Sequence, residues 1–381
     1  MNTGDFILTT NVDISIVLPC LNEETTVAAT IRRAQEGIRR TGSSGEIVVV
    51  DNGSSDLSAD IAAKHGARVV PEPRPGYGAA LLRGFAEAHG RIIVMADADD
   101  TYALDKLPAL VERLEDGADL VIANRYAGMK RDAMPWLHRK VGTPTISWLL
   151  RHVYGVQVAD SQSGYRAFTS DCLELLALRS SGMELASEML AKAAVKGMRV
   201  DEIPSTYLER GGESKLRTFR DGWRHLRLIL TLAPTYLYLV PGVVLSILGI
   251  ITFALAFALS SGLDIGELKW QPVFAGPIFV IVGLNASAMG LAVRRLHIRR
   301  GLVNPSAFDR LDRFFSLENI LCVATAAVVA GIAIDFFIFF RWVGDAEAHP
   351  VGPQLAALAQ TLIVAGTNAG LIGFLTASYE T

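Results

Sequence analysis

The sequence predicts an α/β domain with a mainly parallel sheet, followed by an α-helical membrane domain with four transmembrane helices. In residues 1–216, short apolar runs alternate with helical stretches, an order typical of parallel sheets with right-handed crossovers. In the second part, the ranges 228–263, 270–293 and 351–379 carry no charged residue. The chain of 381 residues is 50% hydrophobic, with a mean hydropathy of +0.32, which is high for a soluble protein.

The expected strands of the first part are each followed by a distinctive loop. Strand 14–18 leads into PCLNEE and a helical stretch to about Arg40, and strand 46–50 leads into DNGSSD and a helix to about His65. A short strand at 68–70, a helix at 79–88 and a strand at 92–96 follow. Because parallel strands end at one edge of a sheet, we expect PCLNEE, DNGSSD and DADDTY to gather there.

Three aspartates, Asp97, Asp99 and Asp100, follow the strand at 92–96. Carboxylates spaced this closely repel one another unless a cation holds them, and hard oxygen ligands suit Mg²⁺ or Mn²⁺. The pattern therefore predicts a metal that is held on a phosphate. A solvated acidic turn is the alternative.

The other loops give weaker signals. Asp51 could accept hydrogen bonds from a base edge, and Asp56 could cap the next helix. The GYG at 76–78 is a weak candidate for a phosphate loop. Each motif alone is also typical of an ordinary helix start. Together, in this order, the motifs are a more specific signal of a nucleotide site.

The apolar stretches are long enough to cross a membrane. A bilayer needs about 20 apolar residues in a helix, so we expect spans at about 236–261, 271–293, 319–341 and 353–378 within a membrane domain of residues 233–381. Asp335 lies in the third span; we expect it to snorkel to the headgroups, with a proton or ligand role as the alternative.

Arginine placement predicts the orientation. The connection after the second span carries six arginines, whereas the loops 264–269 and 341–349 carry one Lys or Arg each. The positive-inside rule then places the first domain and the C-terminus in the cytoplasm of an integral, multi-pass protein of the cytoplasmic membrane.

Residues 217–232 form an expected amphipathic helix, with an apolar stripe that contains Trp223, Leu226 and Leu230 beside a row of arginines. This pattern is typical of a helix in the membrane surface. Packing on the soluble domain is the alternative.

Composition excludes several classes. A net charge of −3 argues against a nucleic-acid partner. Cys20, Cys172 and Cys322 form no CxxC pair, which indicates neither a disulfide framework nor a zinc site. The N-terminus lacks a basic region followed by an apolar core, so no cleaved signal peptide is expected.

The motifs SIVLPCLNEE, VVVDNGSSD, GYGAALLRG, MADADD, ANRY, DSQSGYRAF, GMELASEML and RGGESKLRTFRDGWRHLR together resemble those of the family 2 glycosyltransferases with the GT-A fold. Within them the chain is similar to the polyprenyl-phosphate hexosyltransferases of the dolichol-phosphate mannose and glucose synthase kind. The resemblance covers residues 12–232, and the four-helix tail is similar to that of some members.

The resemblance implies inverting transfer of a single hexose, glucose before mannose, from a nucleotide sugar to polyprenyl or dolichyl phosphate. UDP-hexose is favoured over GDP-hexose, Mg²⁺ or Mn²⁺ is the implied cofactor, and the lipid bilayer is a partner. A homo-oligomer is left open.

The resemblance also implies the site residues. Asp97 and Asp99 match the metal-binding DxD pair, with Thr101 as an optional third ligand. The positions that match donor-binding residues are Pro19, Asn22, Glu23, Asp51 and Gly53, together with Asp97. The positions that match acceptor-phosphate residues are Arg125, Arg139 and Thr143, and those that match a loop closing on the donor are Arg210 and Lys215.

Three acidic residues keep alternative roles. Asp160 in DSQSG could orient the acceptor or Arg166, act as a base, or cap a turn. Glu184 and Glu188 lie where many family 2 enzymes carry a catalytic acid, but they could instead brace the loop around Arg210. A lipid phosphate is already a good nucleophile at neutral pH, so the reaction needs cations more than it needs a strong base.

Two other functions remain open. A processive polysaccharide glycosyltransferase would share the fold and the DxD pair, but its Q-x-x-R-W motif is absent. A non-enzymatic protein that senses nucleotide and binds or translocates lipid is the second alternative, and the DxD pair weighs against it.

Overall fold

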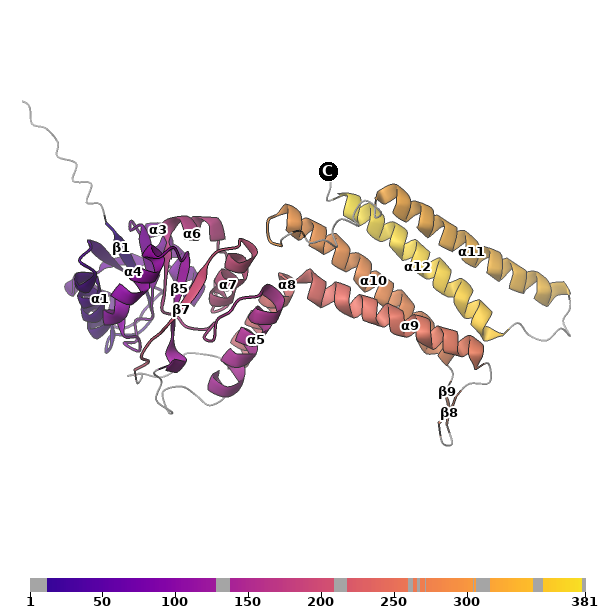
Figure 1. The fold of residues 1–381 in the computed structure, drawn as a ribbon, viewed down its shortest axis with the longest axis horizontal. Helices are drawn as coiled ribbons and strands as arrows, with labels where there is room; N and C mark the ends of the chain where they lie inside the picture. Colours follow the sequence, from indigo (N-terminus) through magenta and orange to yellow (C-terminus); the bar gives the residue numbers. More distant parts are fainter. Residues whose placement is uncertain are drawn as a thin grey trace, which may run out of the picture. The chain divides into compact units, whose positions relative to one another are not determined.

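The computed structural model describes residues 12–127, 138–208, 218–259, 263–265, 268–270, 272–303, 305, 316–344 and 352–378. The chain forms two compact units, Met1–Ile229 and Leu230–Thr381. The first is an α/β unit and the second is helical (Figure 1). The predicted fold class is confirmed.

The described part of the first unit contains a seven-stranded sheet in the order β3-β2-β1-β4-β6-β5-β7. Only β6 runs antiparallel to its neighbours β4 and β5, and the other pairs are parallel. The strands are β1 (Ile14–Cys20), β2 (Gly45–Asp51), β3 (Arg68–Pro71), β4 (Ile92–Met95), β5 (Leu120–Asn124), β6 (Arg166–Thr169) and β7 (Val200–Pro204). The four strands predicted from the sequence are therefore present.

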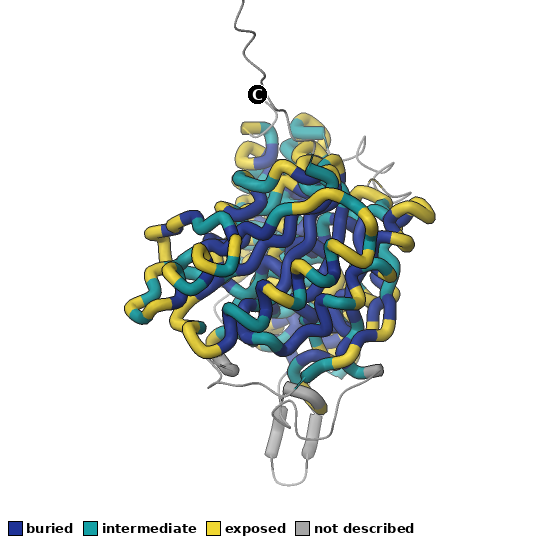
Figure 2. The backbone as a smooth tube through the Cα atoms, turned by 90° about the vertical axis from the view of Figure 1, so that its left-hand side faces the viewer, coloured by how far each residue is buried: buried dark blue, intermediate teal, exposed yellow. Residues whose placement is uncertain are grey.

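Helices cover both faces of this sheet. The central strands β1 and β4 are almost entirely buried (dark blue in Figure 2), whereas the edge strands β3 and β7 are partly exposed. α1 and α4 pack together over one face, whereas α3 contacts β1 and β2. The helices are α1 (Val27–Thr41), α2 (Ser58–Lys64), α3 (Tyr77–Glu87), α4 (Leu107–Glu115), α5 (Thr143–Tyr154), α6 (Ser170–Leu176), α7 (Leu185–Val195) and α8 (Thr218–Thr231), with short helical turns η1 (Leu104–Lys106), η2 (Arg125–Ala127) and η3 (His138–Gly142).

The strand register brings the three predicted loops to one edge. Cys20 at the end of β1 pairs with Asp51 at the end of β2, and Val17 pairs with Met95 at the end of β4. The loops that follow these strands therefore emerge together, as the alternating pattern predicted.

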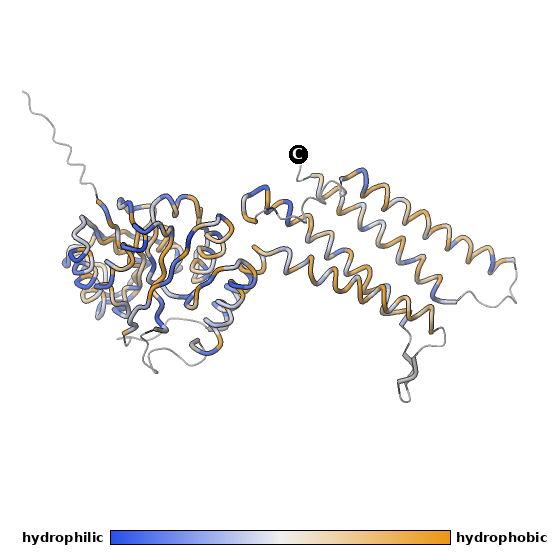
Figure 3. The backbone as a smooth tube through the Cα atoms, viewed as in Figure 1, coloured by the Kyte–Doolittle hydropathy of each residue, from blue (hydrophilic) through white to orange (hydrophobic). Residues whose placement is uncertain are grey.

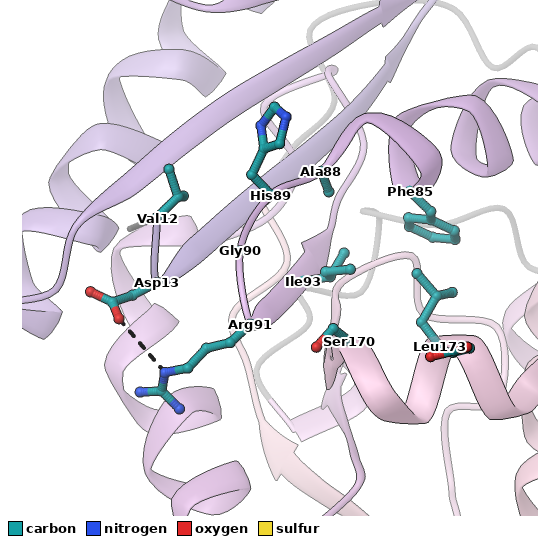
Figure 4. A pocket seen from close by; sticks show the side chains of 11 residues that line it. Val12, Asp13, Phe85, Ala88, His89, Gly90, Arg91, Ile93, Ser170 and Leu173 are labelled. Atoms are coloured by element: carbon teal, nitrogen blue, oxygen red, sulfur yellow. Dashed lines mark ion pairs between the residues drawn. The ribbon is translucent and has the colours of Figure 1, made fainter. Parts of the chain in front are cut away.

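A cavity of about 450 Å³ lies at the opposite edge of the sheet (Figure 4). Its lining includes Asp13 before β1, Arg91 before β4 and Ser170 after the antiparallel β6. Arg91 Nε lies 3.7 Å from Asp13 Oδ1. The cavity is thus separated by the length of the strands from the loops that carry the predicted chemistry.

α8 has one face on the first unit. His225 and Ile229 are buried, and the Tyr154 hydroxyl of α5 donates to the Ile229 carbonyl at 2.9 Å. Trp223, by contrast, is 62% exposed. The helix therefore packs on the unit through a His225–Ile229 stripe and presents Trp223 outward, and its contact with a membrane surface stays a prediction.

Among its described residues, the second unit has four helices long and apolar enough to span a membrane, at Thr235–Ala258, Pro272–Arg299, Leu317–Gly344 and Pro353–Ser378. They are mostly orange in Figure 3, which marks hydrophobic residues. The elements are η4 (Thr235–Leu239), α9 (Val240–Ala258), α10 (Pro272–Arg299), α11 (Leu317–Gly344) and α12 (Pro353–Ser378), with a short ribbon of β8 (Leu263–Ile265) and β9 (Leu268–Trp270) between α9 and α10.

Small residues set the packing of these helices, in the pairs α9 with α10, α11 with α12, and α10 with α12. A Cβ on Gly283 of α10 would lie 2.4 Å from the Ser246 nitrogen of α9, and one on Gly366 of α12 would lie 2.7 Å from the Ala324 carbonyl of α11. Glycine lets the backbones approach closely where lipid offers no hydrophobic driving force.

Candidate active site

Asp97 and Asp99 follow β4 in the turn predicted to hold a metal. Asp99 is 5% exposed, and its Oδ1 accepts hydrogen bonds from the Thr101 hydroxyl at 2.6 Å and the Thr101 nitrogen at 3.2 Å. Asp100 has a φ of 57°, and its Oδ1 lies 2.7 Å from Arg33 Nε of α1. Asp100 is thus paired with α1, while Thr101 holds Asp99 in position.

Tyr77 anchors the first aspartate of the pair. Its hydroxyl, at the start of α3, donates to Asp97 Oδ1 at 2.8 Å. Burial raises the pKa of Tyr77 well above its ordinary value, and the neighbouring Asp97 raises it further, so the hydroxyl keeps its proton and remains a donor. Tyr77 lies inside the GYG motif, but the phosphate-loop interpretation gave the tyrosine itself no role.

The glycines of the GYG motif serve close packing. A Cβ on Gly76 would lie 2.3 Å from the Ser181 carbonyl, and one on Gly78 would lie 2.3 Å from the Ser180 carbonyl. The Ala79 nitrogen donates to Ser181 O at 3.0 Å. The structure thus gives these glycines a packing role against residues 180–182 that the phosphate-loop interpretation did not include.

The loops after β1 and β2 are held together by their side chains. Asn22, at a φ of 51°, accepts from the Ser55 nitrogen at 2.8 Å, and its own nitrogen donates to the Ser54 hydroxyl at 3.0 Å. The Ser54 nitrogen donates to Asp51 Oδ1 at 3.1 Å. Pro19, Glu23 and Gly53 lie in the same two segments, so the residues predicted to bind the donor are near one another.

Asp56 precedes Leu57, the N-cap residue of α2, and its carboxylate bonds to the first turn of that helix. Its Oδ1 accepts from the Ser58 nitrogen at 3.0 Å, and its Oδ2 accepts from the Glu24 nitrogen at 3.2 Å. Asp56 therefore links the start of α2 to the loop after β1.

Arg125 and Asp160 form a buried ion pair. Arg125 is 7% exposed and Asp160 is 0% exposed. Arg125 Nε and Nη2 donate to the two Asp160 oxygens at 2.7 and 2.8 Å, and the Arg125 nitrogen donates to Oδ2 at 3.1 Å. The Arg125 guanidinium also stands 5.4 Å from the ring centroid of Tyr207.

This pairing corrects one role that the sequence left open for Asp160, that of orienting Arg166. Arg166 is fully buried and donates instead to three carbonyls, those of Ser161, Ser163 and Ala186. Glu202 of β7 accepts from the Asp160 nitrogen at 2.8 Å. Asp160 is therefore held inside the fold with Arg125 as its partner.

Glu188 braces a turn that the sequence did not connect with it. Its carboxylate accepts from the Arg179 and Ser180 nitrogens and lies 2.7 Å from Lys192 Nζ. Burial alone would raise the pKa of Glu188, but Lys192 and these N–H groups lower it. The carboxylate is therefore ionised and holds the segment that packs against Gly76 and Gly78.

His225 ties α8 to α7. Its Nδ1 lies 2.8 Å from the Ser187 hydroxyl, which also accepts from Gln162 Nε2 at 3.2 Å. Burial lowers the pKa of His225 to about 4. The imidazole is therefore neutral at physiological pH.

Of the remaining predicted site residues, one has a described side chain. Thr143 is the first residue of α5 and is 5% exposed. Arg210 and Lys215 lie outside the described residues, as does the side chain of Arg139.

The donors near β4 suit a hard divalent cation. Asp97 and Asp99 present oxygen ligands, and one oxygen of each is fixed by a hydroxyl donor, as is usual for metal-binding carboxylates. Across the described ranges, no group of three or more His, Cys, Asp and Glu side chains could hold a metal by itself. Any metal at Asp97 and Asp99 would therefore need further oxygens, from Thr101, water or a bound ligand.

Two family models match the chain. Glycosyl transferase family 2 matches residues 15–170, and the glycosyltransferase family 2 C-terminal transmembrane region matches residues 291–379. Together they cover the strands β1 to β6 with the DxD pair, and the last part of the membrane unit.

Among curated relatives, the low-salt glycan biosynthesis hexosyltransferase Agl6 of Haloferax volcanii is 35% identical over 335 residues, 87% of this chain and 80% of that protein. A dolichyl-phosphate hexose transferase of the same organism is 32% identical, over 55% of this chain and 89% of that protein. A solved glucosyl-3-phosphoglycerate synthase of Mycobacterium tuberculosis has a TM-score of 0.47 and 24% identity, over 58% of this chain and 79% of that chain.

Proposed function

The chain belongs to glycosyltransferase family 2, and from this premise we propose that it transfers one hexose from a nucleotide sugar to the phosphate of a polyprenyl lipid. The observation that carries the proposal is that one chain contains both the unit with the DxD pair and four apolar helices long enough to span a membrane. A soluble acceptor would not need such helices. The relatives named for dolichyl-phosphate hexose transfer support the lipid acceptor.

The donor would lie over the loops after β1, β2 and β4. Asp51 and Asn22 hold these loops with their side chains, and we propose that Pro19, Glu23 and Gly53 complete the nucleoside site. Asp97 and Asp99 would hold Mg²⁺ or Mn²⁺, which would neutralise charge on the donor diphosphate. The chain's own part is to keep both carboxylates oriented through Tyr77 and Thr101.

The acceptor phosphate would be met by cations. Arg139 and Thr143 are the proposed contacts, and Arg125 is the third. Asp160 takes the Nε–H and one Nη2–H of Arg125, so its carboxylate already balances the charge of this buried guanidinium and two of the five N–H groups are used. We therefore propose that Arg139 carries more of the phosphate binding than Arg125, with Arg210 and Lys215 closing on the donor.

The reaction would invert the anomeric carbon. The phosphate oxygen forms the new bond to that carbon as the bond to the nucleoside diphosphate breaks, and the leaving diphosphate takes the electron pair. A lipid phosphate is largely ionised at neutral pH, so no base needs to remove a proton. We favour glucose and a UDP donor over mannose and GDP.

The test is turnover by the purified full chain in lipid with polyprenyl phosphate, Mg²⁺ and a panel of nucleotide sugars. Mass spectrometry should find one hexose on the lipid phosphate and released nucleoside diphosphate. If both ligands bind but no lipid-linked sugar forms, the proposal fails.

A matched pair of variants tests the site. Asp99→Ala should lower transfer by about 100-fold or more without unfolding the protein. Asp100→Ala removes a neighbouring carboxylate that pairs with Arg33, so it should retain most activity. Equal loss in both variants would contradict the assignment.

The orientation is a further part of the proposal. The protein is a membrane protein by its C-terminal transmembrane region, and we propose that the catalytic unit and the C-terminus are cytoplasmic. A cysteine placed at Gly301, after α10, should react with membrane-impermeant reagents only from the cytoplasmic side. Labelling from the outside alone would reverse the topology.

A further inference from the structure

A polar pair links the last two membrane helices. Gln360 Nε2 of α12 donates to Asp335 Oδ2 of α11 at 3.0 Å. Gln360 is exposed and Asp335 is partly exposed, whereas Gly331 and Ala359 nearby are buried in the contact between the two helices. The pair therefore lies on the flank of the α11–α12 contact.

Asp335 lies within the apolar part of α11. α11 has 28 residues, and Asp335 is nine residues before its end at Gly344. That distance is about 14 Å along a helix of about 42 Å, which is longer than the roughly 30 Å hydrocarbon core. The Asp335 side chain meets Gln360 of α12, a contact that the snorkelling expectation did not include, and snorkelling itself stays a prediction.

The pair keeps unused hydrogen-bonding groups. Within the described residues, the bond to Gln360 is the one polar contact of Asp335, which leaves Oδ1, and Gln360 retains its second amide hydrogen. Polar groups left unpaired in hydrocarbon are costly. Ionisable residues within membrane helices usually face a partner or a water-filled path.

We propose that a second copy of this chain covers the flank. In a two-fold arrangement, Gln360 uses one amide hydrogen for its own Asp335 and the other for Oδ1 of the second copy's Asp335. The pair is therefore self-complementary, as an isologous contact requires. A cationic partner would meet the carboxylate but leave the amide hydrogen without an acceptor.

The same side of α11 offers apolar contact. Phe339 is four residues beyond Asp335, hence on the same helix face, and is 52% exposed. α11 is also the least buried of the four candidate spans. The polar pair would fix the register of the contact, while aromatic side chains supply packing area. This inference does not depend on the proposed reaction.

The first test measures association in vesicles. The full chain, labelled with one fluorophore and reconstituted at decreasing protein-to-lipid ratios, should show two-step photobleaching. Asp335→Leu with Gln360→Leu should weaken dimerisation by about tenfold, the loss expected for two interhelical hydrogen bonds. Asp335→Asn keeps hydrogen-bonding capacity, so its dimer affinity should stay closer to that of the parent.

Thr367→Val is the matched control. Thr367 is exposed on α12, and its hydroxyl bonds within its own helix to Ile363 O at 2.7 Å, so its loss should leave dimerisation unchanged. A monomeric parent protein, or a double variant that dimerises like the parent, would overturn the proposal.

Cross-linking locates the face. In a Cys322→Ser background, which removes the exposed native thiol, Phe339→Cys should give a cross-linked dimer with a short bis-maleimide. Phe337→Cys is also exposed but lies on the opposite side of α11, and should not. Cross-linking at 337 and not at 339 would refute this face.

Discussion

Asp160→Asn tests whether the buried Arg125–Asp160 pair positions the site or Asp160 acts as a base. The substitution is nearly isosteric and removes one charge from a carboxylate that is 0% exposed. Arg125, itself 7% exposed, would keep its charge without a counter-charge. Its two side-chain bonds of 2.7 and 2.8 Å would both weaken.

The expected loss follows from that geometry. Breaking a buried pair by removing one partner costs about 3–5 kcal/mol; since Asn can still accept one bond, we take the lower figure. A loss of ~3 kcal/mol corresponds to roughly 6–12 °C in Tm for a unit of this size. Transfer activity should fall together with stability.

The assay is thermal unfolding of the full chain in detergent beside hexose transfer at a temperature where the variant is folded. Arg125→Met, and its combination with Asp160→Asn, complete a double-mutant cycle that should return a coupling of at least ~1 kcal/mol. Asp201→Asn is the control, because its pair with the half-exposed Arg199 should contribute at most about 1 kcal/mol.

The opposite result would have a clear meaning. An Asp160→Asn protein that has the Tm of the parent but no transfer activity would refute the positioning role of Asp160 and favour its role as a base. Additive effects of the Arg125 and Asp160 substitutions would also contradict the pair.

Three further outcomes are expected. Tyr77→Phe removes the donor to Asp97 and should lower kcat about tenfold, with a higher Mg²⁺ concentration for half-maximal rate and an unchanged Tm; an unaltered metal dependence would contradict the anchoring role. Gly78→Ala places a Cβ 2.3 Å from the Ser180 carbonyl, so thermal unfolding should show a loss of about 2 kcal/mol or more, and a Tm equal to the parent's would show that the segment can move aside. The pKa of His225 is about 4 when folded against about 6.5 unfolded, so the contribution of neutral His225 to stability is complete above pH 6.5 and declines as pH falls toward 4. Between pH 7 and pH 5, the Tm of His225→Asn should therefore fall less than the Tm of the parent. Equal falls in Tm would exclude this contribution of His225.

The sequence predicted what depends on local pattern. Apolar runs ending in polar loops identified the first four strands, and uncharged stretches identified the membrane helices. The gathering of Asp51 and Asp97 at one edge followed because parallel strands share an edge. Each of these conclusions needs only the periodicity of a segment and a general rule of sheet topology.

Pairings between distant segments were not predictable in this way. Arg125 and Asp160 are separated by 35 residues and meet because β6 is inserted antiparallel between β4 and β5, an arrangement that no hydrophobic period encodes. Asp335 and Gln360 meet for a similar reason, since the rotation of α11 against α12 is set by Gly331 and its neighbours. The missing observation was burial for Arg125 and Asp160, and the facing of the two helices for the partly exposed Asp335.

Tyr77 shows how a site depends on residues far from it in sequence. The Glu188 carboxylate accepts hydrogen bonds from the Arg179 and Ser180 nitrogens. The carbonyl of the next residue, Ser181, accepts from the Ala79 nitrogen at the start of α3. That contact sets where α3 begins and so where the Tyr77 hydroxyl meets Asp97. Glu188, which the sequence offered as a catalytic candidate, thus influences the position of Asp97 through backbone contacts. These contacts form because glycines at 76 and 78 let the two segments touch.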